Sequence, residues 1–91
     1  MTDLELTKAC AEAMGFTIFE EHEHNGLWCH GPDRSQHGFW YHPLHDDAQA
    51  LALGKTHPEE FEAAVLDWTS AKRRGENPDL NRILCGNVAR K

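Results

Sequence analysis

The pattern of apolar and polar positions predicts a helix at the start of the chain. In TDLELTKACAEAMG (residues 2–15), apolar side chains recur every three or four positions, which is typical of one buried helix face. Thr2 and Glu5 have the spacing of a capping box, and Gly15 is a common helix stop. The inner face is expected to consist of Leu6, Ala9, Cys10 and Ala13.

The next segment, FTIFEEHEHNGLWCH (residues 16–30), is typical of a β-hairpin. It begins with β-forming side chains, and Asn25-Gly26 is a preferred pair for a two-residue turn. A turn-rich stretch follows, and FWYHP then predicts a third short strand that ends at Pro43.

An Asn-Gly turn would also set the register of the hairpin. It places His22 opposite Cys29 and His24 opposite Leu27, and opposed residues share a face of the sheet. One face is therefore expected to carry His22, His24 and Cys29. The other face is expected to carry Phe19, Trp28 and His30.

Three further helices are predicted after the strands. LHDDAQALALG (residues 44–54) would begin at Asp46 or Asp47 and end at Gly54. Its inner stripe is expected to consist of Leu44, Ala48, Leu51 and Ala52.

THPEEFEAAVLDWTSAKRRG (residues 56–75) has the clearest helical pattern. It pairs Thr56 with Glu59 in a second capping box, tolerates Pro58 in its first turn and stops at Gly75. Its buried side is expected to hold Phe61, Ala64, Val65, Leu66 and Trp68.

NPDLNRILCGNVARK (residues 77–91) predicts the last helix, with Asn77 as cap and Pro78 as first residue. Its apolar stripe would be Leu80, Ile83, Leu84 and Val88. The order is α-β-β-β-α-α-α over residues 1–91, which indicates one α+β domain with helices packed on a small three-stranded antiparallel sheet.

Size and charge narrow the kinds of partner. A chain of 91 residues buries only about two thirds of the surface that it exposes when unfolded, so we expect a homo-oligomer, most simply a dimer. The net charge is −6, and the basic side chains gather in the last twenty residues. An acidic body of this kind excludes duplex nucleic acid as a bulk partner.

Cysteine usage indicates a reducing compartment. Cys10, Cys29 and Cys85 are odd in number and widely spaced, and no signal peptide precedes them. We therefore expect free thiols in a cytoplasmic protein, and no apolar run is long enough to cross a membrane.

Two stretches, MTDLELTKACAEAMGF and WYHPLHDDAQALAL, resemble small phage and prophage proteins of the "phage ABA sandwich" type, most of which have no assigned function. The closing DLNRILCGNVARK is similar to the last Arg-containing helix of that family. The matching motif consists of Trp40 or Tyr41, Pro43, Leu44, Asp46, Asp47, Ala50 and Leu51. The chain departs from the family in its His-rich hairpin and in PEEFEAAVLDW, where relatives have further strand.

This resemblance implies a phage accessory protein, made in the bacterial host cell, that counters host defence. It would bind a host defence protein or sequester a nucleotide signal. The motif also has a simpler interpretation, in which Asp46 and Asp47 cap a helix while Leu44 and Leu51 pack in the core.

Aromatic and Arg side chains are the main candidates for ligand binding. Aromatic rings stack on nucleobases and guanidinium groups match phosphates, so a nucleotide signal is the leading candidate ligand. The candidate residues are Trp28, Arg34, Phe39, Trp40, Tyr41, Arg73, Arg74 and Arg82. Alternatively, some of the aromatic rings are ordinary core residues.

Two other sites remain open. The acidic hairpin beside Trp28 suits direct inhibition of a host defence protein. The face with His22, His24 and Cys29 could hold zinc in a structural module, with His42, His45 or water as fourth ligand, although solvated histidines explain the same pattern. No motif for a nucleophile, phosphate loop or deaminase is present, so we expect binding and not catalysis, with no cofactor.

Overall fold

The computed structural model describes residues 2–22, 26–31 and 38–91, and it confirms the predicted α+β order. The three strands form one antiparallel sheet with β2 in the middle. The elements are α1 (Asp3–Ala13), β1 (Thr17–His22), β2 (Gly26–His30), β3 (Phe39–Tyr41), α2 (Asp47–Thr56), α3 (Pro58–Arg73) and α4 (Leu80–Ala89).

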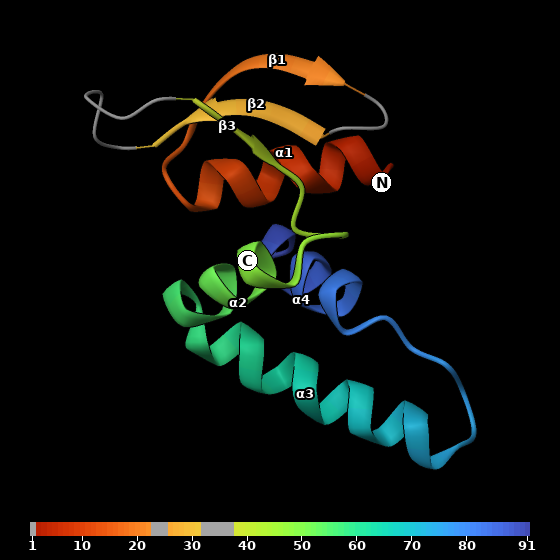
Figure 1. Ribbon diagram of the computed structural model, residues 1–91. Coiled ribbons are helices and arrows are strands. Elements are labelled where there is room, and N and C mark those ends of the chain that lie inside the picture. Colours follow the sequence, from red (N-terminus) through yellow and green to blue (C-terminus); the bar gives the residue numbers. More distant parts are fainter. Residues whose placement is uncertain (1, 23–25, 32–37) are drawn as a thin grey trace.

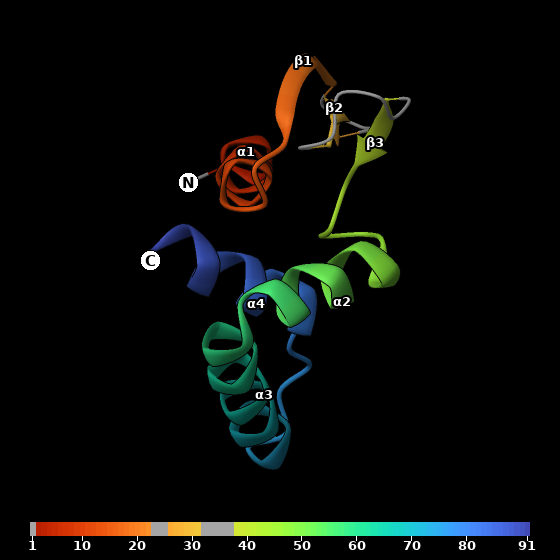
Figure 2. The same ribbon diagram turned by 90° about the vertical axis from the view of Figure 1, so that its left-hand side faces the viewer.

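The elements are stacked along one direction, from the sheet to α3 (Figure 1). The sheet rests on α1, and α4 lies beneath α1 and also contacts α2 and α3. Figure 2 shows the same layers from the side, with α3 at the end farthest from the sheet. The molecule is accordingly elongated, with extents of 45 × 25 × 21 Å.

The opening helix begins and ends as predicted. The Thr2 hydroxyl oxygen accepts a hydrogen bond from the Glu5 backbone N–H at 3.1 Å, and Gly15 follows the helix with φ of 78°. Leu6 and Cys10 are buried as expected. Ala13 is exposed, whereas Thr7 and Ala11 are buried, so the inner face is turned slightly from the predicted one.

The register predicted for the hairpin is wrong. Cys29 pairs with Ile18, and His22 pairs with Gly26, which therefore belongs to β2 and not to a two-residue turn. The register also shifts between Ile18 and Glu20, where the regular alternation of β1 is interrupted at Phe19. A bulge of this kind cannot be read from a periodic pattern.

The core lies between the inner face of the sheet, α1 and α4. Leu27 of β2 lies opposite Tyr41 of β3, and Cys29 lies opposite the partly buried Phe39. The thiols of Cys10 on α1 and Cys85 on α4 are also part of the core. Its main members are Leu6, Cys10, Leu27, Cys29, Tyr41, Leu44, Leu53, Leu84, Cys85 and Val88.

Two predicted boundaries around α2 and α3 are wrong. Gly54 does not end α2 but lies inside it. A side chain at this position would collide with the ring of Phe61, which accounts for the glycine. Thr56 is the last residue of α2 and not a cap, since its hydroxyl donates to the Ala52 carbonyl. The N-cap of α3 is His57, followed by Pro58 in the first turn.

The predicted buried stripes of these helices also need correction. Leu51 is 50% exposed, and Leu66 is 63% exposed on the outer side of α3. Ala50, Leu53 and Gly54 are the buried residues of α2, and Ala64 and Ala71 those of α3. Small side chains at these contacts let the helix backbones approach closely.

The last helix follows its predicted apolar stripe but begins later than expected. Asp79, and not Asn77, is its N-cap, and the Asp79 carboxylate accepts from the Arg82 backbone N–H at 3.2 Å. Leu84 and Val88 are buried. In the described part of the chain, no helix is long and apolar enough to span a membrane.

Candidate functional site: an aromatic face of the sheet

The face of the sheet that points away from α1 carries a cluster of rings. Trp28 and Trp40 oppose each other on β2 and β3, with centroids 5.1 Å apart. His22 lies 5.2 Å from Trp40, and Phe19 lies 4.6 Å from His30. We call these five residues the aromatic face.

Strand alternation explains why these rings gather on one side. Leu27 and Cys29 are completely buried beneath the sheet, so Trp28 and His30 point to its other side. On β3, Trp40 follows the same rule beside the buried Tyr41. The sequence predicted that Phe19, Trp28 and His30 share a face, and the structure adds Trp40 and His22.

The cluster has a packed part and an exposed part. A Cβ at Gly38 would lie 2.6 Å from the indole of Trp28, so the backbone there lies directly against that ring and half-buries it. Trp40 is 38% exposed and Phe19 is 60% exposed. The packed indole holds the cluster in place, and the exposed rings offer apolar area to a partner.

The charges around the aromatic face are acidic. Glu20 lies opposite Trp28 in the strand pairing and is exposed. Glu21, at the edge, forms an ion pair with Lys8 of α1. The described strand residues include no Lys or Arg. Glu21 therefore belongs to the side of the sheet that faces α1, and a ligand on the rings would meet the Glu20 carboxylate but no Lys or Arg of the described strands.

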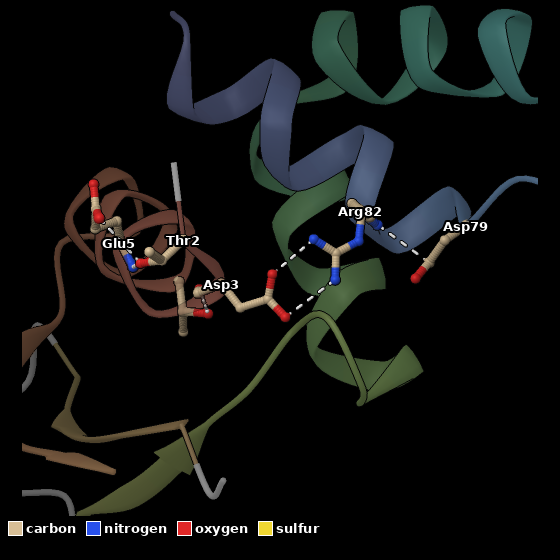
Figure 3. Close-up of polar contacts among 6 residues, drawn as sticks. Thr2, Asp3, Glu5, Asp79 and Arg82 are labelled. Carbon is tan, nitrogen blue, oxygen red and sulfur yellow. Dashed lines mark hydrogen bonds and ion pairs between the residues drawn. The ribbon is translucent and has the colours of Figure 1, made fainter. Parts of the chain in front are cut away.

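The Arg candidates do not join the aromatic candidates. Arg73 and Arg74 stand at the end of α3, the helix farthest from the sheet (Figure 1), and Arg74 pairs with Glu76 at 2.9 Å. Both terminal nitrogens of the Arg82 guanidinium donate hydrogen bonds to the Asp3 carboxylate (Figure 3). Arg34 lies outside the described residues.

Two of the aromatic candidates belong to the core and not to the surface cluster. Phe39 and Tyr41 point to the inner side of the sheet, where each packs edge-on against Phe16 at a centroid distance of 5.0 Å. Of the eight candidates, the structure thus brings only Trp28 and Trp40 together on an accessible face.

The predicted zinc face is not formed as expected. Cys29 is buried beneath the sheet, and its burial raises the pKa of the thiol to about 11, whereas His22 lies on the aromatic face. His24 lies outside the described residues. His42 and His45 stack with centroids 4.6 Å apart near the start of α2, and burial lowers the pKa of His42. Within residues 2–22, 26–31 and 38–91, no three His, Cys, Asp or Glu side chains form a metal-binding group.

The segment from Trp40 to Leu51 is a junction between β3 and α2. The Asp46 carboxylate caps α2 by accepting from the Gln49 backbone N–H at 3.0 Å, and Asp47 accepts from the Asn81 side chain at 3.0 Å. The Gln49 amide accepts from the His42 backbone N–H at 2.5 Å and donates to the Trp40 carbonyl at 2.6 Å. This glutamine, which the sequence did not single out, fixes the position of Trp40 relative to the helices.

Two open grooves flank α4, away from the aromatic face. One, of about 670 Å³, lies between α2, α3 and the segment before α4, and Leu51, Phe61 and Leu80 line it. The other, of about 630 Å³, lies on the opposite side of α4 and is bordered by Leu6 and Ile83. Both are lined mainly by apolar side chains.

Comparison of the chain with family models, curated proteins and solved structures finds no match. The resemblance to small phage proteins therefore stays a prediction from sequence.

Proposed function

We propose that this protein acts by binding a basic surface of another protein through its aromatic face. The observation that carries the proposal is the combination of exposed rings with the exposed Glu20 carboxylate on a sheet whose described strand residues include no Lys or Arg. Guanidinium and ammonium groups are attracted to the faces of Trp rings. Trp and Arg are also the side chains that most often dominate binding energy at protein interfaces.

The same arrangement argues against an anionic nucleotide at this face. A nucleobase could stack on Trp40, but its phosphates would meet Glu20. Phosphates in proteins are usually held by guanidinium groups, amines or helix N-termini. Arg73 and Arg74 lie at the far end of the molecule, and Arg82 is already paired. A protein partner thus fits the face better than the nucleotide signal suggested by composition.

The resemblance to small phage proteins suggests what kind of partner this is. Under the proposal, the protein acts in the cytoplasm of a bacterial host and inhibits a defence protein non-enzymatically. An acidic, aromatic surface would compete for a basic site that the defence protein uses to hold nucleic acid. The acidic charge would speed association, and the rings would supply the apolar area at the centre of the interface.

Titration with defined peptides tests the chemistry of the face. The fluorescence of Trp28 and Trp40 should change when an arginine-rich peptide is added and should not respond to a glutamate-rich peptide of equal length. Trp40→Ala should weaken binding by about 10-fold or more, which is typical of an interface residue that dominates binding. Glu20→Gln should weaken binding less, and the effect of Glu20 should fade at high salt.

The matched control is Leu51→Ala, because Leu51 is a half-exposed apolar residue on α2 and outside the aromatic face. This variant should bind the peptide as the wild type does. Equal binding by the wild type and Trp40→Ala would contradict the proposal. A panel of cyclic and linear nucleotides forms the second arm, and a rise of the melting temperature with any of them that needs Trp40 would favour nucleotide sequestration instead.

A further inference from the structure

The outer side of α3 carries two apolar residues at the centre of the helix. Val65 is 36% exposed and Leu66 is 63% exposed, and together they span the midpoint of Pro58–Arg73. The buried residues of this helix, Ala64 and Ala71, lie on its other side, against α4. In Figure 1, α3 is the outermost helix, at the end of the molecule farthest from the sheet.

Charge is divided between the two ends of the same face. The first turns carry Glu59 and Glu62, which are exposed, and the last turn carries Lys72 and Arg73. Helical periodicity places Glu62 and Arg73 on the same side as Leu66. We use the name α3 outer face for Glu59, Glu62, Val65, Leu66, Lys72 and Arg73 together. It is acidic at one end, apolar in the middle and basic at the other end.

We propose that a second copy of this chain covers the α3 outer face, with the two α3 helices antiparallel across a two-fold axis. In this arrangement residues at equal distances from the helix midpoint oppose each other. Val65 then meets Leu66 of the partner subunit at the centre. At each end, Glu59 and Glu62 of one copy lie near the basic last turn of the other copy. A parallel pairing would instead bring like charges together.

The surface area of the chain supports such a contact. Its accessible surface is 5919 Å². A compact monomer of 10.3 kDa is expected to expose about 5,400 Å². Two chains therefore carry an excess of about 1,000 Å², which is about the smallest area expected of a biological interface. This excess of accessible surface agrees with the elongated shape of the molecule, in which α3 lies at one end.

This inference does not depend on the proposed function, because the sheet that carries the aromatic face and α3 lie at opposite ends of the molecule (Figure 2). The mass of the protein in solution, measured by light scattering or sedimentation, tests it. The wild type should have the mass of two chains at about 100 μM. At this concentration a dimer with a dissociation constant in the micromolar range is almost fully formed. Leu66→Asp should have the mass of one chain. The matched control Phe19→Asp, an exposed aromatic residue on β1, should remain a dimer.

A charge exchange tests the antiparallel geometry itself. Glu59→Lys should weaken the dimer by about 10-fold, because it would place a lysine opposite Lys72 of the partner subunit. Adding Lys72→Glu in the same chain should restore the dimer, since the two-fold axis places the two exchanged charges opposite each other again. Far-ultraviolet circular dichroism establishes that each variant is folded. A wild type of one chain mass at about 100 μM, a dimeric Leu66→Asp or a charge exchange without rescue would each overturn the proposal.

Discussion

The guanidinium of Arg82 on α4 donates two hydrogen bonds to the carboxylate of Asp3 in the first turn of α1, at 2.7 and 3.1 Å (Figure 3). The pair joins two helices that are distant in sequence. The hydrogen bonds from Arg82 hold the pKa of Asp3 below its usual value, and the carboxylate raises the pKa of Arg82. Both side chains remain about half exposed.

Loss of this ion pair should cost stability only where Asp3 is ionised. The pKa of Asp3 is lower in the folded than in the unfolded chain, so its contribution is present above the unfolded pKa and is lost as the pH falls through the folded one. We expect Arg82→Ala to lower the free energy of unfolding at pH 7 by about 0.2–1 kcal/mol, the range for exposed ion pairs. The difference should shrink as the pH falls below the ordinary pKa of an aspartate and should vanish once Asp3 is protonated in the folded chain as well.

Urea denaturation at several pH values measures this effect. Arg74→Ala is the matched control, because Arg74 forms an exposed pair with its neighbour Glu76 and joins no separate elements. A difference between Arg82→Ala and the wild type that persists unchanged at low pH would show that Arg82 acts through packing and not through Asp3.

Replacement of Gln49 should loosen Trp40. In Gln49→Ala the His42 backbone N–H and the Trp40 carbonyl both lose their partner at the junction of β3 and α2. We expect a loss of about 1 kcal/mol in unfolding free energy, because the part-buried His42 N–H would be left unpaired, whereas the exposed Trp40 carbonyl can bind water instead. Trp fluorescence should shift as the indole of Trp40 gains exposure. Gln49→Glu keeps the acceptor for His42 and should lose less, and equal stability of all three chains would contradict this role.

Removal of the Tyr41 hydroxyl should not destabilise the protein. Tyr41 is only 2% exposed, and its hydroxyl finds no hydrogen-bond partner among the described residues. Burial, with the nearby Cys10, Cys85 and Cys29, raises the pKa of this phenol well above its usual value. Tyr41→Phe removes the desolvated group and keeps the ring, so thermal unfolding should show equal stability or a gain of up to about 1 kcal/mol. A loss of more than that would reveal a partner for the hydroxyl.

The buried thiols should be unreactive until the chain unfolds. Cys29 is completely buried, and burial raises its pKa to about 11, so at pH 8 less than about 1% of it is thiolate, the reactive form. A thiol-specific dye should label no cysteine quickly in the native protein and all three in denaturant. The labelling rate should follow global unfolding. Fast native labelling that disappears in Cys29→Ala would show that the sheet opens locally.

Local capping signals allowed much of the helical framework to be predicted. Thr2 and Asp46 are caps because a hydroxyl or carboxylate can reach a backbone N–H within one turn, and this depends on nearby residues alone. Gly54 misled the prediction because its role depends on the ring of Phe61. A glycine that ends a helix and one that admits a neighbouring ring look the same in sequence.

The candidate site was predicted only in part, for a similar reason. Strand alternation predicted that Trp28 and Phe19 lie on one face, and they do so in the structure although the register differs from the predicted one. The shift near Phe19 moved His22 away from Cys29, and no local pattern marks such a bulge. The exclusion of the Arg side chains from the aromatic face depends on the packing of whole helices, which periodicity does not describe.

The elongated stacking has a consequence for valency. Because the aromatic face and the α3 outer face lie at opposite ends of a molecule 45 Å long, a dimer formed through α3 would carry two aromatic faces at its outer ends. A partner with repeated basic sites could then be held at two points at once. Avidity of this kind can exceed single-site affinity by about 100-fold or more where both sites can be reached together. A modest surface on a small chain would thus suffice to hold an oligomeric target tightly.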